Sequence, residues 1–163
     1  MKMAAEFRTA SDDVIEIAKE IIAKWHPHLR YARIGFLFRS EAPVSGGRVT
    51  LGKAKLVTGE MKVYADYDFL IWLARDYYSG MTDAQREALI DHELCHCLFD
   101  EAEGKAAIRG HDIEEFNCIL DRHGFWWNGS EKTAQAVQGH FFSFRTQGVV
   151  EPATVPAGTA GFE

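Results

Sequence analysis

Hydrophobic residues recur at helical spacing near the start of the chain. Ser11 is suited to cap a helix, and Asp12 and Asp13 follow where the helix dipole is positive. Pro27 closes the segment, because a proline cannot continue the hydrogen-bond ladder of a helix. The apolar positions between these limits are Val14, Ile15, Ile17, Ala18, Ile21, Ile22 and Trp25. The pattern predicts an amphipathic helix between Ser11 and Pro27.

The next segments show the patterns of strands. Residues 32–39 alternate, with Ile34, Phe36 and Phe38 on one side, and this predicts a strand. Residues 40–47 contain a proline and two glycines and predict a loop, followed by a second strand at residues 49–57 that a glycine interrupts. The apolar run at residues 69–74 fits either a buried strand or the start of a helix, since periodicity does not separate the two in short runs.

A capping box marks the start of another helix. Thr82 is followed three residues later by Gln85, so the helix is expected to begin at about Asp83. Its buried stripe is predicted to consist of Leu89, His92, His96 and Phe99. Two histidines on this stripe are expected to face inward, under the cover of the domain.

The rest of the chain is predicted to hold one more major helix. Residues 104–110 are interpreted as a connector, and the helix opens at the cap-like pair Asp112 and Glu115 and ends at Gly124. A turn at residues 126–129 and a short helix at residues 131–138 follow. We expect one domain over residues 1–146 and a flexible tail over residues 147–163, which holds prolines and glycines but no basic residue.

Composition limits the classes of function. With 163 residues, 47% hydrophobic and 12% aromatic, the chain is expected to fold around a single core. A formal charge of -6 argues against nonspecific nucleic-acid binding, because such binding needs a basic surface. The sequence has neither a signal peptide pattern nor a membrane-spanning run, and its three cysteines are interpreted as reduced thiols. We therefore expect a cytoplasmic protein without membrane partners.

The segment 92–96 carries the clearest chemical signal. His92 and His96 lie four residues apart, so on a helix their imidazoles share one face and can bind one metal ion. Glu93 lies beside them, where a carboxylate can take a proton from a metal-activated water. This His-Glu-x-x-His pattern predicts a zinc site with Glu93 as the catalytic base. The alternative is two structural histidines beside a surface glutamate, which we consider less favourable because polar groups aimed at a core are costly unless something binds them.

A catalytic zinc ion needs a third protein ligand. We favour His111, because Gly110 lets the chain turn towards the metal just before the next helix. Glu115 is the rival ligand, although it is also explained as part of the helix cap. Asp112 could orient a ligand imidazole. His123 is interpreted mainly as a cation at a helix end; three further histidines, His26, His28 and His140, are interpreted as structural or solvent-facing.

These segments resemble a known family. The matching pieces are Trp25-His26-Pro27 with the strand that follows, residues 52–55, residues 85–96 and residues 110–116. Together they are similar to a family of phage metallopeptidases, and more distantly to SprT-like peptidases and to prophage peptidases that cleave repressors. The resemblance implies a zincin-like α+β fold, a divalent metal and peptidase chemistry. In peptidases of this kind a strand commonly precedes the active helix, so by analogy we favour a strand at residues 69–74.

Two hypotheses of function follow. The first is a zinc-dependent endopeptidase of phage or prophage origin, which cleaves a protein or peptide substrate in a bacterial host cell. The second is a non-catalytic adaptor, stabilised by metal, that binds a host or phage protein. The intact Glu93 favours the enzyme, since a purely structural site has no need for that carboxylate. A nucleic-acid-associated protease is the least favoured, because the chain lacks a basic extension.

Overall fold

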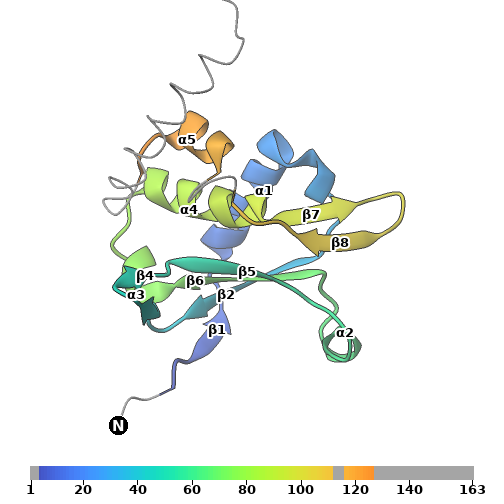
Figure 1. The fold of residues 1–163 in the computed structure, drawn as a ribbon, viewed down its shortest axis with the longest axis horizontal. Helices are drawn as coiled ribbons and strands as arrows, with labels where there is room; N and C mark the ends of the chain where they lie inside the picture. Colours follow the sequence, from blue (N-terminus) through green and yellow to red (C-terminus); the bar gives the residue numbers. More distant parts are fainter. Residues whose placement is uncertain (1–3, 112–115, 127–163) are drawn as a thin grey trace, which may run out of the picture.

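The fold is α+β, with one layer of helices over a mixed sheet (Figure 1). We describe residues 4–111 and 116–126, as placed in a computed structural model of the protein. The strands are β1 (Phe7–Thr9), β2 (Ile34–Arg39), β3 (Val44–Ser45), β4 (Arg48–Val49), β5 (Gly52–Leu56), β6 (Phe69–Ala74), β7 (Cys97–Asp100) and β8 (Lys105–Ile108). The helices are α1 (Asp12–Trp25), the 3-10 turn η1 (Pro27–Leu29), α2 (Met61–Tyr64), α3 (Arg75–Tyr78), α4 (Asp83–Cys95) and α5 (Asn117–His123).

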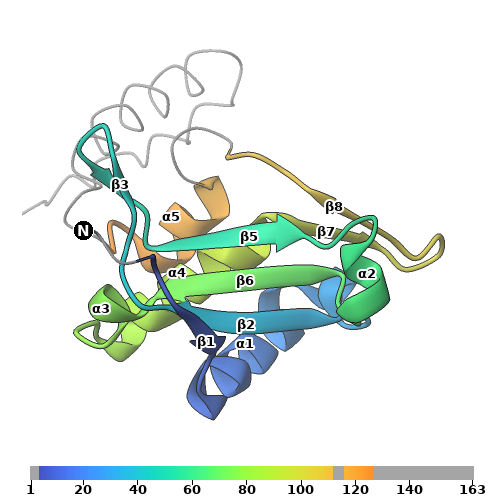
Figure 2. The ribbon, with the colours of Figure 1, turned by 90° about the horizontal axis from the view of Figure 1, so that it is seen from below.

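The main sheet has the strand order β1-β2-β6-β5. The central strands β2 and β6 run parallel, whereas β1 and β5 are antiparallel to their neighbours. Figures 1 and 2 show α1, α4 and α5 on one side of this sheet. The core lies between the two layers, where Phe69, Ile71 and Leu73 of β6 are fully buried beside Leu94 of α4.

Several predictions of local structure are confirmed. The first helix spans Asp12–Trp25, residues 69–74 form strand β6, and the helix after Thr82 begins at Asp83. The capping box is complete, since Thr82 and Gln85 exchange hydrogen bonds in both directions. Ser11 does occupy the N-cap of α1, but its side chain makes no capping hydrogen bond.

The second predicted strand is divided. Residues 48–49 form β4, which pairs with β3 inside the predicted loop, and β5 begins only at Gly52. Gly46 and Gly47 form the turn between β3 and β4 with φ values of 55° and 77°, a region that favours glycine. The loop prediction therefore missed a short hairpin.

Two predictions after α4 are wrong. The helix ends at Cys95, so Phe99 lies on strand β7 and does not continue the helical stripe. The predicted connector at residues 104–110 contains strand β8, which pairs with β7. Asp100 makes the hairpin possible, because its Oδ1 accepts hydrogen bonds from the backbone of Ala102 and Glu103 at the turn.

The later predictions fall partly outside the described residues. Helix α5 ends at His123 with Gly124 as its C-cap, in agreement with the predicted end, but its N-cap is Phe116 and its first residue is Asn117. The predicted cap residues 112 and 115, the helix at 131–138 and the tail at 147–163 lie outside the described residues. Within the described ranges, no helix has both the length and the apolar character needed to cross a membrane.

The capping box predicts a measurable contribution to stability. Thr82→Ala removes the side-chain oxygen that accepts from the backbone N–H of Gln85, so the free energy of unfolding should fall by about 1 kcal/mol. Ser11→Ala is the matched control, because the Ser11 side chain makes no capping bond, and it should cost only a few tenths of a kcal/mol. Urea unfolding of both variants measures the difference, and equal losses would contradict the assignment.

Candidate metal centre

Three histidines from separate positions in the sequence converge at the end of α4. His92 lies on the last turn of α4, His96 is its C-cap residue, and His111 follows strand β8. One ring nitrogen from each of the three lies within 4.8 Å of the others, and the Nε2 atoms of His92 and His111 are 3.0 Å apart. Two nitrogens bound tetrahedrally to one zinc ion lie roughly 3.4 Å apart. The donor set therefore fits a single metal ion.

The end of the β7–β8 hairpin holds His111 beside α4. The backbone N–H of Arg109 donates to the carbonyl of His96 at 2.9 Å, and its side-chain Nε donates to the carbonyl of Cys95 at 2.7 Å. In return, Nδ1 of His96 donates to the carbonyl of Arg109 at 2.8 Å. This bond fixes the orientation of the imidazole and leaves Nε2 as the donor for a metal.

Phe116 forms an apolar wall against all three imidazoles. Its ring is fully buried, and its centroid lies 5.3, 4.8 and 5.1 Å from those of His92, His96 and His111. An apolar neighbour restricts solvent on that side and limits ring rotation. The contact of Phe116 with the histidines depends on how α5 packs against α4, so no local pattern in the sequence reveals it.

Glu93 is buried between α4 and the edge strand β5. Its side chain is 3% exposed, which excludes the alternative of a surface glutamate. A Cβ atom added to Gly52 of β5 would lie only 2.6 Å from Glu93 Oε1 and 3.0 Å from its Cδ and Cγ. The absence of a side chain at Gly52 thus makes room for the Glu93 carboxylate between α4 and β5.

A second buried cluster is centred on Asp91. The carboxylate accepts hydrogen bonds from His26 at 2.6 Å, from Arg122 at 2.8 Å and from His123 at 2.9 Å, and it is fully buried. Burial by itself raises the pKa of the Asp91 carboxyl, but the bonds from His26, Arg122 and His123 outweigh it and lower the pKa to about 2. The carboxylate is therefore charged at neutral pH.

This cluster shows the contacts of two histidines that the sequence interpreted as structural or as a helix-end cation. His26 is buried, as a structural histidine should be, and His123 binds Asp91 as well as standing at the helix end. Asp91 with His26 and Cys95 also has the spacing of a metal site, but Arg122 already balances the charge of the carboxylate. Asp91 itself was missed, although Ala88 and Cys95 at helical spacing mark its face of α4 as buried.

The remaining predicted residues lie apart from the histidines or outside the described residues. His28 is hydrogen-bonded to the carbonyl of Cys97 at 3.2 Å, which is a structural role. Asp112, Glu115 and His140 lie outside the described residues.

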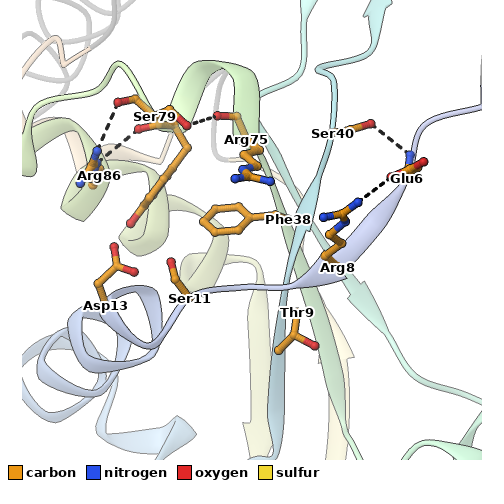
Figure 3. A pocket seen from close by; sticks show the side chains of 11 residues that line it. Glu6, Arg8, Thr9, Ser11, Asp13, Phe38, Ser40, Arg75, Ser79 and Arg86 are labelled. Carbon is orange, nitrogen blue, oxygen red and sulfur yellow. Dashed lines mark hydrogen bonds and ion pairs between the residues drawn. The ribbon is translucent and has the colours of Figure 1, made fainter.

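A separate hollow of about 570 Å³ contains neither the three histidines nor Glu93. In Figure 3, Arg8 of β1, Phe38 of β2 and Arg75 of α3 project towards this space. Arg86 already donates to the carbonyls of Tyr78 and Ser79 at its rim. The hollow is thus distinct from the metal centre.

Comparison with known proteins defines the class. The family described as "Putative phage metallopeptidase" matches residues 6–139, and the chain belongs to this family. No curated protein and no solved structure matches the chain. Membership of a metallopeptidase family supports a peptidase-type enzyme and implies a metal ion, for which the three converging histidines are the candidate ligands.

The Asp91 cluster predicts strong effects on stability. Asp91→Asn leaves Arg122 without its buried counter-charge, so the free energy of unfolding should fall by about 3–5 kcal/mol. Because the folded pKa of about 2 lies below the ordinary 3.8, the unfolded chain binds the proton first as the pH falls. The wild type should therefore lose about 2 kcal/mol between roughly pH 4 and pH 2, and this contribution should be missing in the variant.

The matched control is Asp121→Asn, which removes a carboxylate from an exposed position of α5 next to Arg122. Its cost should stay within about 0.5 kcal/mol. Urea unfolding at several pH values measures both variants. A similar loss of unfolding free energy in both variants would show that the buried Asp91 contributes no more to stability than an exposed carboxylate.

Proposed function

We propose that the protein is a zinc-dependent endopeptidase of phage or prophage origin with a zincin-like active site. The observation that carries this proposal is the convergence of the three imidazoles at the end of helix α4, which also carries the buried carboxylate of Glu93. Imidazole nitrogen is a preferred ligand of zinc, and a set of three protein ligands leaves a fourth position for water or substrate. In this proposal His92, His96 and His111 hold the metal, and Glu115 remains the rival to His111.

The chemistry is divided between the metal and the side chains. Zinc, when bound, supplies a Lewis acid that polarises a peptide carbonyl and lowers the pKa of water. Glu93 accepts the proton of the attacking water and later delivers it to the leaving amine nitrogen. Gly52 has no side chain and so leaves room for the Glu93 carboxylate. His96 is held in one orientation by its hydrogen bond to the carbonyl of Arg109.

Strand β5 offers a place for an extended substrate. It is an edge strand of the main sheet, and its hydrogen bonds to β6 alternate along the chain. Ala74 donates to the carbonyl of Leu51, and Val57 donates to the carbonyl of Asp68. The odd-numbered residues of β5 therefore face β6, and the backbone groups of Gly52, Ala54 and Leu56 face the edge at which no other described strand pairs. A peptide added along this edge would pass beside Glu93.

The proposal also includes a substrate class and a cellular location. We propose that its substrate is a protein or peptide in the cytoplasm of a bacterial host cell. The buried Glu93 disfavours the alternative of a metal-stabilised adaptor, because a purely structural site does not need a buried carboxylate next to a ligand in the sequence.

Replacement of the base tests the proposal directly. Glu93→Gln keeps the size of the side chain but cannot accept the proton, so cleavage of an unfolded protein should fall by at least about 100-fold. Zinc content, measured by mass spectrometry of the metal, should stay near that of the wild type. Undiminished turnover would refute the role of Glu93.

Two controls make this result specific. Glu87→Gln changes an exposed glutamate on the same helix and should leave both turnover and zinc content unchanged. His111→Ala should instead lose zinc on dialysis and lose turnover with it. If His111→Ala keeps its zinc, whereas Glu115→Ala loses it, the third ligand is Glu115.

A substitution at Gly52 is expected to lower kcat and to leave KM nearly unchanged. Gly52→Ala places a methyl group where the Glu93 carboxylate lies, and a displacement of about 1 Å can cost roughly 100-fold in rate. We expect kcat to fall by about 10- to 100-fold, with KM and zinc content nearly unchanged. Gly35→Ala is the control, because its added Cβ would meet the movable side chain of Leu70 on β6, and its kcat should be normal. A rise in KM alone would contradict the positioning role of Gly52.

A further inference from the structure

Two of the three cysteines face each other between α4 and α5. The Sγ atoms of Cys95 and Cys118 are 3.4 Å apart, although the two residues are separated by 23 positions. Cys95 is buried and Cys118 is half-buried, so one residue of the pair is partly exposed to solvent. Cys97 differs from both, because its thiol donates to the carbonyl of Glu93 and it is fully buried in the main core.

We propose that Cys95 and Cys118 are an oxidation site, at which a peroxide forms an intramolecular disulfide that joins α4 to α5. A disulfide requires the sulfurs to approach to about 2.05 Å. Starting from 3.4 Å, this needs a shift of little more than 1 Å, shared between a helix end and the short helix α5. The proposal is independent of the peptidase activity.

The oxidation takes place in two balanced steps. The Cys118 sulfur attacks hydrogen peroxide, the O–O bond breaks, and a sulfenic acid and one water form. The Cys95 sulfur then attacks the Cys118 sulfur, the S–O bond breaks, and a second water leaves. The proton of the Cys95 thiol joins the departing hydroxyl group and leaves in that second water. The two thiols lose two electrons in total, and the peroxide gains two.

The crosslink would restrict the movement of the segments that carry His96, His111 and Phe116. Cys95 precedes His96 in sequence, and Cys118 follows two residues after Phe116, whose ring packs against the three imidazoles. A bond between the two sulfurs closes a loop that includes His96, strands β7 and β8, and His111. Oxidation would thus tie down the segment that carries two of the proposed ligands.

Peptide mapping of the full chain tests the crosslink. The reduced protein is treated with hydrogen peroxide, remaining thiols are alkylated, and the product is digested with trypsin. We expect peptide 87–105 joined to peptide 110–122, with the mass of the pair less two hydrogen atoms. Because peptide 87–105 contains both Cys95 and Cys97, Cys97→Ala should keep the crosslink and Cys95→Ala should lose it.

Cys118→Ser provides a second, milder variant in case Cys95→Ala does not fold. It should lose the crosslink, and its melting temperature should not respond to peroxide. The wild type should gain on the order of 10 °C on oxidation, as expected for a disulfide that closes a loop of this length. A crosslink that persists in Cys95→Ala, one that forms only between two chains, or oxidation of Cys118 without a crosslink would each overturn the proposal.

A further measurement concerns the metal and rests on the proposed function. Zinc loss to an excess of EDTA should be several-fold slower from the oxidised wild type than from the reduced protein, and the rate for Cys118→Ser should not change with oxidation. An unchanged rate in the crosslinked wild type would refute the link to the histidines. Failure of the protein to bind zinc would instead refute the proposed function, and the crosslink would still stand on the peptide map.

Discussion

The buried carboxylate of Asp91 is the interaction on which the helical layer depends. It is fully buried and holds groups from the end of α1 and from α5 against the middle of α4. A buried charge is tolerated only when it is paired and hydrogen-bonded, and here Arg122 and two histidines satisfy it. Because Asp91 directly precedes His92, the same bonds fix α4 where the metal centre begins.

The metal centre depends equally on where α4 ends. His96 is the C-cap, and the chain leaves the helix directly into β7. The hairpin then returns to the helix end, where Arg109 bonds to His96 and Cys95 and brings His111 within reach of His92. A longer helix would carry the chain away from this point. The early helix end is therefore what allows three distant histidines to meet.

Local signals in the sequence predicted the local structure. The capping box at Thr82, the alternation before Arg39 and the spacing of His92 and His96 each depend on neighbouring residues, and the structure has each of these features. Strand β8, by contrast, has the weak sequence Lys-Ala-Ala-Ile and becomes a strand only through pairing with β7. Likewise, Gly52 looked like an interruption of a strand. A glycine is needed there because the carboxylate of Glu93, 41 positions later in the chain, occupies the space of a side chain. Contacts between distant segments left no local pattern to read.

Two buried carboxylates on α4, only two residues apart, have different surroundings. Residues at this spacing point to nearly opposite sides of a helix, so Asp91 faces α1 and α5, whereas Glu93 faces the edge of the sheet. Asp91 is held by an arginine and two histidines, which keep its pKa low and make it a poor proton acceptor. Glu93 lies instead against Gly52 on β5, which is an edge strand of the main sheet in the described part of the chain. Separate surroundings of this kind let one carboxylate stabilise the fold while the other has, in the proposed mechanism, the role of proton acceptor.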